Sequence, residues 1–380
     1  MAQNFINMRP KLLIIENSID VTGALKAILG SSSYLKNDCD FVFIIPTGSK
    51  AKTLVEREGF IVYELPLKEI SKSLSSIVLY VPFLLVNVLK LKKIIHKEDI
   101  DLVVNNDCYN LLPPLHRFLG SRIPYVCFVR FIPSRFPRIL VEFWLKTQLK
   151  FSHKLIAVSE AVKMELPLHS KIIKQYEGID CSTLFRLNEQ SKKILYLANY
   201  IQGKGQEYAL RSFSTICKSF PEWKLKFVGG TMGLQKNREF KRMLGFMSKQ
   251  LDCGKQVEFA DFEENVSVEF GDTAIVLNFS DSESFSFTCI EAMQAGLPVI
   301  ATLSGGPQEF IVHDKNGLLV SVRGIDEMVK QLEMLMHSSE RRNQIGREAR
   351  NTIERKFNIL HTSKALLEIY REALTGATLN

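Results

Sequence analysis

Residues Asn278–Val320, which read NFSDSESFSFTCIEAMQAGLPVIATLSGGPQEFIVHDKNGLLV, decide the fold. An apolar run ends at Asn278, a polar loop follows, and a helix-forming stretch, Phe287–Ala295, stops at Gly296 and Pro298. A second apolar run comes directly after. This order of strand, loop, helix and strand is typical of a parallel sheet whose polar loops gather at the carboxyl ends of its strands.

The same alternation extends over the whole chain. We expect strands at Lys11–Ile15, Phe41–Ile45, Ile61–Leu65, Leu102–Asn105, Pro124–Val129, Leu155–Val158, Ile172–Tyr176, Ile194–Leu197, Leu225–Val228, Val257–Ala260, Ala274–Leu277, Val299–Ala301 and Gly317–Val320. Helix-forming stretches lie between most of them, and three close the chain, at Ile325–His337, Glu340–Phe357 and Leu360–Leu374. The polar, aperiodic segment Leu184–Lys192 predicts a domain junction. The pattern therefore predicts an α/β fold of two doubly wound, Rossmann-like domains facing a central cleft.

The composition is that of a globular protein. The chain has 380 residues, 46% hydrophobic and 24% charged, which suits two domains of ordinary size. Its seven cysteines lack a Cys-x-x-Cys spacing, which favours reduced thiols in a cytoplasmic protein over disulfides or zinc. Met1–Pro10 does not read as a signal peptide, and the longest apolar stretch, Ile77–Leu89, is too short for a membrane span.

Positive charge is concentrated in the first half of the chain. The net charge is +8, and residues 1–180 hold 24 Lys and Arg against 17 Asp and Glu. Such asymmetry favours an anionic partner for the first domain. Pro82–Glu98 and Ser134–Lys154 mix apolar with basic residues, which suits reversible contact with an anionic membrane surface. Helices that simply pack on their own sheet are the open alternative, and nucleic acid is the least favoured partner because no binding module is recognisable.

Two glutamates in the first-quoted stretch are candidate ligand-binding residues. Glu283 lies in the loop and Glu291 in the helix, so we expect both to face one cleft. The helix start would offer its backbone N–H groups to a phosphate, from Ser284, Phe285, Ser286 and Phe287. The carboxylates would then accept hydrogen bonds from hydroxyls, Glu291 from a ribose and Glu283 from a hexose. A helix cap and a surface ion pair are the alternative interpretation.

Two basic residues at strand ends are candidate phosphate ligands. Lys204 lies in Gly203-Lys204-Gly205, directly after a predicted strand, and Arg130 follows another strand in the first domain. A flexible ammonium suits a diphosphate. Ordinary solvated residues are the alternative for both.

The stretch resembles the retaining family-4 glycosyltransferases of GT-B fold. The residues that carry the resemblance are Glu283, Glu291, Ala292-Met293, Gly296-Leu297-Pro298-Val299 and Gly305-Gly306-Pro307-Gln308-Glu309. The resemblance implies an acceptor-binding domain at 1–185, a nucleotide-sugar-binding domain at 186–358, and a terminal helix, 359–380, that crosses back to the first domain. It also assigns Glu283 to the donor sugar and Glu291 to the ribose.

Further positions follow from the resemblance. Lys204 matches a family lysine that neutralises the leaving diphosphate, whereas Asn199 stands where the family has arginine. Arg130 stands where a histidine is common, and we expect it to compensate for that missing charge. Phe262 ends the segment whose backbone would read the base, and Gly23 lies in a loop near phosphate or acceptor.

The resemblance implies retaining, metal-independent transfer of a hexose or its derivative from a UDP- or GDP-sugar to a saccharide or lipid-linked acceptor, as in the synthesis of cell-surface polysaccharide or glycolipid. We expect no cofactor or metal, because Asp38-Cys39-Asp40 and Asp99-Ile100-Asp101 read as turns and the histidines are dispersed. The expected location is cytoplasmic, with peripheral attachment to the inner face of the membrane left open. A silent glycan-binding or scaffold protein of GT-B fold and a sugar-nucleotide epimerase are the alternatives.

Overall fold

The strands form two separate parallel sheets. The computed structural model describes residues 9–67, 74–263 and 265–376, and within them one sheet has seven strands and the other six. The chain divides into two compact units, the first made of residues 1–178 and 359–380 and the second of 179–358. The predicted fold of two doubly wound α/β domains is confirmed.

The first unit holds the seven-stranded sheet, in the order β3-β2-β1-β4-β5-β6-β7. Its strands are β1 (Lys11–Ile15), β2 (Asp40–Pro46), β3 (Ile61–Leu65), β4 (Leu102–Asn105), β5 (Tyr125–Val129), β6 (Lys154–Ala157) and β7 (Ile172–Lys174). Its helices are α1 (Gly23–Tyr34), α2 (Ala51–Arg57), α3 (Leu74–Glu98), α4 (Leu112–Phe118), α5 (Arg138–Phe151), α6 (Glu160–Met164) and α13 (Ile359–Gly376). The strand order reverses between β1 and β4, which is the switch point of the sheet.

The second unit holds the six-stranded sheet, in the order β10-β9-β8-β11-β12-β13. Its strands are β8 (Lys193–Leu197), β9 (Lys224–Val228), β10 (Val257–Ala260), β11 (Ile275–Asn278), β12 (Val299–Thr302) and β13 (Leu318–Val320). Its helices are α7 (Gln206–Ile216), α8 (Gln235–Gln250), α9 (Ser267–Phe270), α10 (Phe287–Gln294), α11 (Ile325–His337) and α12 (Ser339–Lys356). Here the order reverses between β8 and β11.

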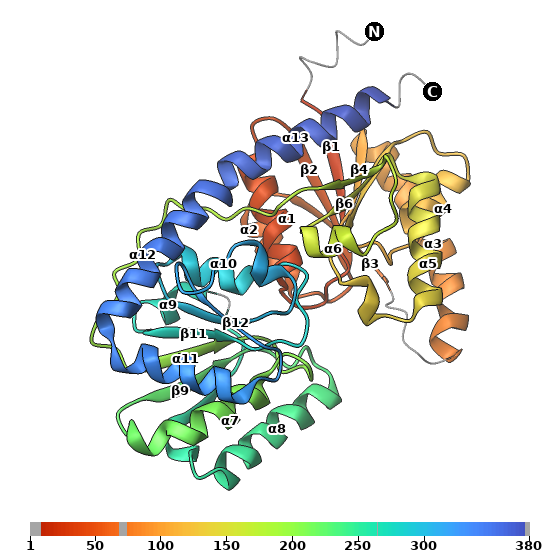
Figure 1. Cartoon of the computed structure of the whole chain (residues 1–380). Helices are drawn as coiled ribbons and strands as arrows, with labels where there is room; N and C mark the ends of the chain where they lie inside the picture. The colour runs from red at the N-terminus through yellow and green to blue at the C-terminus, as the bar shows by residue number, and fades with distance from the viewer. Residues whose placement is uncertain (1–8, 68–73, 264, 377–380) are drawn as a thin grey trace. The chain divides into compact units, whose positions relative to one another are not determined.

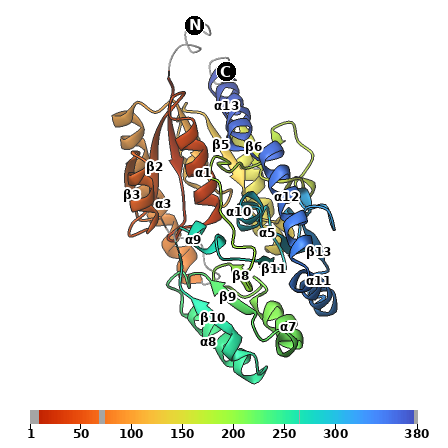
Figure 2. The same ribbon diagram turned by 90° about the vertical axis from the view of Figure 1, so that its left-hand side faces the viewer.

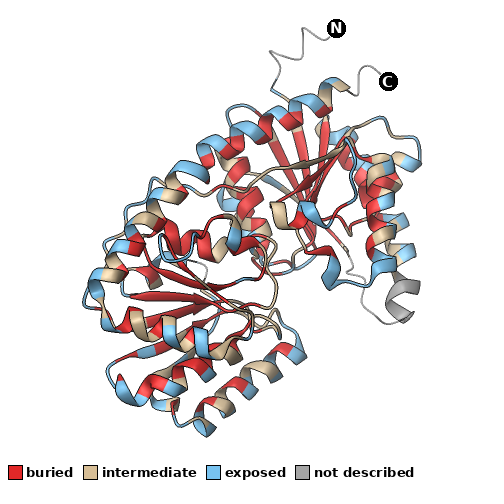
Figure 3. Cartoon of the chain, viewed as in Figure 1, coloured by how far each residue is buried: buried red, intermediate tan, exposed pale blue. Residues whose placement is uncertain are grey.

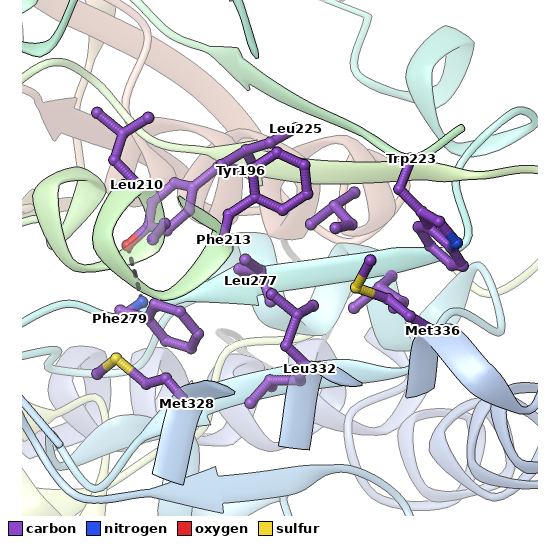
Figure 4. Close-up of a cluster of buried hydrophobic side chains, with 14 of the residues drawn as sticks. Tyr196, Leu210, Phe213, Trp223, Leu225, Leu277, Phe279, Met328, Leu332 and Met336 are labelled. Carbon is purple, nitrogen blue, oxygen red and sulfur yellow. Dashed lines mark hydrogen bonds between the residues drawn. The ribbon is translucent and has the colours of Figure 1, made fainter. Parts of the chain in front are cut away.

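Both sheets are covered on both faces, as near-continuous apolar strands require. In the second unit Ile194 and Tyr196 of β8 belong to the hydrophobic cluster under α7 and α11. The residues that alternate with them, Leu195 and Leu197, are also buried. Figure 4 shows this cluster, with Leu210, Phe213, Met328 and Leu332 from the two helices closing over the strands. In Figure 3 the central strands of both sheets are mostly red and the edge strands β3, β7 and β10 are mostly not, whereas most helices turn one buried face inward and one exposed face outward.

The chain passes between the units twice at one place. Gly178 ends the first unit's leading segment, and a Cβ there would lie 2.8 Å from the Cα of Ile359, where the chain returns. One residue further on, the Ile179 N–H donates to the Phe357 carbonyl, 2.9 Å away. The observed division thus precedes the predicted one at 185/186. Helix α13 then packs on α1, β4 and β5 of the first unit. Figure 1 and Figure 2 both show it beside α1.

The polar segment after Gly178 belongs to the second unit because its polar groups are bonded there. The Asn188 N–H donates to the Gly271 carbonyl at 2.8 Å, and the Asn188 amide donates to Asp272 at 3.1 Å. Gln294 of α10 donates to the Thr183 carbonyl at 3.0 Å. The segment predicted as the junction is therefore held by hydrogen bonds within the second unit.

Candidate active site

A lysine and a glutamate meet at the switch point of the second sheet. Lys204 follows β8 and Glu283 follows β11, and Lys204 Nζ lies 2.8 Å from Glu283 Oε1. The same carboxylate oxygen accepts a hydrogen bond from Ser280 Oγ at 2.6 Å. The lysine side chain is 34% exposed and the glutamate 11%, so the pair is anchored yet reaches solvent. This is where open α/β sheets bind ligands.

A glycine explains why Lys204 reaches this place. Gly205 has φ +79°, and a Cβ there would lie 2.0 Å from the Phe279 carbonyl oxygen, so only glycine fits. The buried Tyr196 hydroxyl joins the two loops from below, since it accepts from the Phe279 N–H at 2.7 Å and donates to the Lys204 carbonyl. Burial raises the pKa of Tyr196 well above its ordinary value, which keeps this hydroxyl protonated as a donor.

The Gly305-Gly306 pair fixes the backbone of Glu283. The Glu283 N–H donates to the Ser304 carbonyl at 2.9 Å, and the Gly306 N–H donates to the Glu283 carbonyl at 2.8 Å. A Cβ on Gly306 would lie 2.4 Å from the Cα of Phe285, so the loops touch backbone to backbone. The loop after β12 therefore sets where the glutamate stands.

The start of α10 has an unusual backbone. Ser286, the residue before the helix, has φ +71°, a left-handed conformation that costs a residue other than glycine about 1–3 kcal/mol. The Asn278 amide donates to Ser286 Oγ at 2.9 Å and holds it there. The serine at this position thus adopts a conformation that glycine would take without strain.

The remaining residues of the predicted phosphate loop have distinct surroundings. The Phe285 side chain is buried against Phe310 and Phe357, which anchors the loop in the core. Ser284 and Phe287 are half-buried. Glu291 lies in α10, only 9% exposed, one helical turn after Phe287. Loop and helix therefore carry both predicted glutamates within a single segment of the second unit.

Asn199 and Phe262 lie together beside Gly230. The Gly230 N–H donates to Asn199 Oδ1 at 2.9 Å, and a Cβ on Gly230 would lie 3.4 Å from the Cβ of Phe262. These residues follow β8, β9 and β10, three neighbouring strands. Phe262 is 38% exposed, so its ring remains accessible. The side-chain oxygen Asn199 Oδ1 is used within the protein, to order the loop after β9.

Arg130 lies in the first unit, inside a buried polar network. It donates from Nη2 to Asn106 Oδ1 at 2.8 Å and forms an ion pair with Glu177. The Asn106 amide in turn donates to Glu16. The Arg130 side chain is 6% exposed, and burial lowers its pKa. The guanidinium is thus engaged by groups of its own unit, and its predicted role toward the leaving diphosphate stays a prediction.

Gly23 is the first residue of α1 and is exposed. The Thr22 hydroxyl before it caps the helix by accepting from the Leu25 N–H at 3.2 Å. Gly23 is thus at a capped helix start near the end of β1.

The sequence reasoning missed several groups that build the site. Ser280 and Asn278 support Glu283 and Ser286, and both lie in the quoted stretch as polar residues at a strand end. Glu16 and Asn106 follow apolar strands in the same way, which was a usable signal. Tyr196 gave none, because its role depends on a contact with a residue 83 positions away.

The described residues contain neither a cluster of metal-ligating side chains nor a helix that could span a membrane. Across 9–67, 74–263 and 265–376, no three His, Cys, Asp or Glu side chains gather as a metal site would require. Over the same ranges, no helix combines the length and the apolar character needed to cross a bilayer.

Comparison with sequence families gives matches to both units. The model described as Glycosyl transferases group 1 matches residues 185–352, and Glycosyltransferase Family 4 matches residues 36–182. An uncharacterized glycosyltransferase of Haemophilus influenzae is 26% identical over 66% of this chain and 71% of its own length. N-acetyl-alpha-D-glucosaminyl L-malate synthase of Bacillus anthracis is 27% identical over 46% of this chain, and the match spans only 43% of that relative.

Solved structures share the fold. HepE of Anabaena, crystallised with UDP and glucose, superposes with a TM-score of 0.82 and 18% identity over 95% of this chain and 99% of its own. The galactosyltransferase WaaB of the lipopolysaccharide outer core superposes with a TM-score of 0.64 and 16% identity over 95% of this chain and 99% of its own. The two family matches together span most of the sequence, and the chain belongs to the family-4, or group 1, glycosyltransferases of GT-B fold.

Proposed function

We propose that this glycosyltransferase moves a hexose or hexose derivative from a UDP- or GDP-sugar to a saccharide or lipid-linked acceptor, in the synthesis of cell-surface polysaccharide or glycolipid. The observation that carries the proposal is the Lys204–Glu283 pair at a sheet switch point beside the start of α10. A cation, a carboxylate and the N–H groups of a helix start match the pyrophosphate and hydroxyls of such a donor.

Each residue has a stated role. Lys204 leaves Glu283 to pair with the pyrophosphate, and the backbone N–H groups of Ser284 to Phe287 bind the same group. Glu283, released from the lysine, accepts hydrogen bonds from the sugar hydroxyls. Glu291 accepts from the ribose, and the Phe262 segment contacts the base.

The transfer retains the configuration at the anomeric carbon. The bond from that carbon to the β-phosphate oxygen breaks while the acceptor hydroxyl attacks from the same face. The acceptor's proton passes to the leaving phosphate oxygen, so the products are the glycoside and the nucleoside diphosphate. The protein contributes positioning and charge stabilisation, which are the main sources of catalysis when no covalent intermediate forms.

In this proposal Arg130 does not contact the diphosphate and acts through its bonds to neighbouring residues of the first unit. Its guanidinium is held by Asn106 and Glu177, and removal from that network would leave buried partners unpaired. We therefore assign Lys204 and the α10 amides as the groups that offset the leaving charge, and expect activity without an added metal ion.

The donor class draws support from a relative. HepE of Anabaena was crystallised with UDP-glucose, and its chain shares the fold over 95% of this one. The same donor class suits the second unit of this chain, where Lys204, Glu283 and Phe262 follow the ends of β8, β11 and β10.

The experiment is a thermal-shift panel of UDP, GDP and their sugars on the full chain, followed by assay of nucleoside diphosphate release with and without EDTA. One nucleotide family should raise the melting temperature, because a ligand that binds only the folded state stabilises it. Lys204→Ala should lose release activity, whereas the exposed Lys236→Ala should not.

Other results would contradict the proposal. Stabilisation without any release of nucleoside diphosphate identifies a silent binding or scaffold protein. Conversion of the donor sugar without an acceptor identifies an epimerase, and loss of activity in EDTA contradicts metal independence.

We also propose reversible attachment of the first unit to an anionic membrane, which would hold a lipid-linked acceptor nearby. Helices α3 and α5 both pack on α4 and expose apolar side chains, with Leu89 63% and Ile139 83% exposed. Basic residues flank them, among them Lys93 and Arg138. Each basic group near an anionic surface contributes about 1 kcal/mol.

Vesicle flotation tests this attachment. The chain should float with vesicles of phosphatidylcholine and phosphatidylglycerol but not with phosphatidylcholine alone. Ile139→Glu should weaken flotation without changing diphosphate release to a water-soluble acceptor, and equal flotation with both vesicles would contradict an electrostatic attachment.

A further inference from the structure

A pocket lies wholly within the first unit, apart from the Lys204–Glu283 site. It opens between α3 and the loops that follow β1 and β4, and holds about 520 Å³ of space, part of it in open solvent. Tyr80 and Phe83 of α3 line it together with Tyr109 after β4. Two buried asparagines, Asn17 and Asn87, also line it, and their side-chain amides are polar groups that could recognise a ligand.

One polar atom of each asparagine side chain is hydrogen-bonded within the protein. The Asn110 amide donates to Asn17 Oδ1 at 2.9 Å, and Asn110 cannot be turned because its own Oδ1 accepts from the Leu112 N–H at 2.9 Å. The Asn87 amide donates to the Pro66 carbonyl at 3.2 Å. These bonds therefore determine which polar atom of each asparagine side chain is not used in them.

The two remaining side-chain atoms are one hydrogen-bond donor, Asn17 Nδ2, and one acceptor, Asn87 Oδ1. Among the described residues, neither Asn17 Nδ2 nor Asn87 Oδ1 has a hydrogen-bond partner, although both atoms are buried. Asn17 is 8% exposed and Asn87 3%. A buried polar group without a partner costs about 1–3 kcal/mol, which a ligand that supplies the bonds would recover.

We infer that this pocket binds an uncharged saccharide ring as part of the acceptor. A hydroxyl both donates and accepts, so a ring that carries several can satisfy Asn17 Nδ2 and Asn87 Oδ1 together. Aromatic side chains offer the flat apolar surface on which the C–H face of a sugar packs. Within the part of the chain that the structure describes, no lining residue is charged.

Other occupants match less well. A lipid tail would leave both amide atoms without partners, at the cost given above. A phosphate or carboxylate would meet an amide oxygen, Asn87 Oδ1, and no cation among the described lining. Among the residues that the structure describes, the positive charge of the first unit therefore does not extend into this pocket.

The inference rests on the proposed transfer, because it specifies the acceptor of that reaction. Its test uses saturation-transfer NMR on the full chain, with methyl β-D-glucopyranoside and methyl β-D-galactopyranoside as probes. Glucose 6-phosphate is the charged comparison and hexanol the apolar one. Asn17→Leu removes the donor and Phe83→Leu removes the ring, while Asn37→Leu, at an exposed position of the same unit, is the matched control.

At least one neutral glycoside should bind the unmodified chain, more tightly than glucose 6-phosphate or hexanol. Asn17→Leu and Phe83→Leu should each weaken that binding about tenfold, and Asn37→Leu should not. The thermal shift given by UDP or GDP should persist in all three variants, since the donor residues lie in the second unit.

Three results would overturn the inference: no binding of either glycoside, tighter binding of the charged or apolar probe, or unchanged glycoside binding in both pocket variants. If Asn17→Leu fails to fold, Phe83→Leu alone decides. Failure of the nucleotide panel with glycosides still bound here would instead contradict the proposed donor site and leave this pocket standing.

Discussion

Each sheet brings a cation and a carboxylate together beyond the carboxyl ends of its strands, but the two pairs differ in their surroundings. In the first unit, Arg130 and Glu177 pair inside the protein, with side chains 6% and 9% exposed. In the second, Lys204 and Glu283 pair at the surface of the site, with side chains 34% and 11% exposed. The first pair is a buried ion pair, and the second is a cation and an anion that a ligand can separate.

This difference shows that a charged residue at a strand end has no fixed role. Arg130 and Lys204 both follow a buried parallel strand. What separates them is the surroundings: Arg130 is bonded to the buried Asn106 and Glu177, whereas Lys204 is paired where it still reaches solvent. A buried charge that loses its partner cannot be hydrated, so the fold of the first unit depends on the Arg130 ion pair.

The largest effect should follow from Arg130→Met. This change leaves Glu177 and Asn106 unpaired in the interior, so the free energy of unfolding of the first unit should fall by about 3–5 kcal/mol. Each unit carries one buried tryptophan, Trp144 in the first and Trp223 in the second. Urea unfolding followed by the fluorescence of Trp223→Phe and Trp144→Phe versions measures the units separately.

In this experiment the Trp144 transition should move to lower urea while the Trp223 transition stays in place. Lys204→Met is the matched change in the other unit and should move neither transition by more than about 1 kcal/mol. A stable Arg130→Met chain would mean that the two ion pairs are energetically alike.

Acid should destabilise the first unit before the second. Burial, with Lys92 next in effect, lowers the pKa of His116 on α4 to about 4. As pH falls below about 6.5, the unfolded chain takes up this proton before the folded one does, so stability is complete above that pH and is lost progressively down to about pH 4. The loss should approach about 3 kcal/mol. The second unit's histidines, His313 and His337, are exposed.

His116→Gln tests the assignment, with His313→Gln as the control. The Trp144 transition of His116→Gln should depend less on pH between about 4 and 6.5 than that of the unmodified chain. An equal slope in both chains would assign the acid sensitivity to other groups.

Lys204→Ala should change activity and leave the fold intact. Removal of the cation beside the pyrophosphate should lower turnover about 100-fold, or about 2.7 kcal/mol of transition-state stabilisation. Initial rates of nucleoside diphosphate release measure this effect. Turnover within twofold of the unmodified chain would refute the leaving-group role.

Glu291→Gln should give the smallest effect. It replaces a charged acceptor with a neutral one, and we expect about tenfold weaker nucleotide binding, or about 1.4 kcal/mol. Calorimetric titration with UDP and GDP measures it, with the exposed Glu222→Gln as control. Equal affinities in both variants would contradict the ribose contact.

The regular parts of this fold could be predicted from the sequence, and the contacts between loops could not. β1, β3, β4, β10 and α11 have the predicted bounds, because the apolar and β-branched pattern of a strand and the periodicity of a helix act over a few residues. The quoted stretch likewise gave Glu283 and Glu291 their loop and helix. The Lys204–Glu283 contact and the partners of Arg130 could not be predicted from the sequence. They depend on contacts between distant segments, Gly205 with Phe279 and Glu177 with Arg130 at the end of β5.

Helix α13 has a consequence for how the protein is made. The first unit lacks one of its covering helices until Ile359–Gly376 has been synthesised, although its sheet leaves the ribosome before the second unit does. The second unit is continuous in sequence and can close while translation is still under way. The domain that emerges first is therefore finished last, and a nascent chain that stalls before Ile359 would expose the apolar surface that Leu366, Leu367 and Tyr370 normally cover.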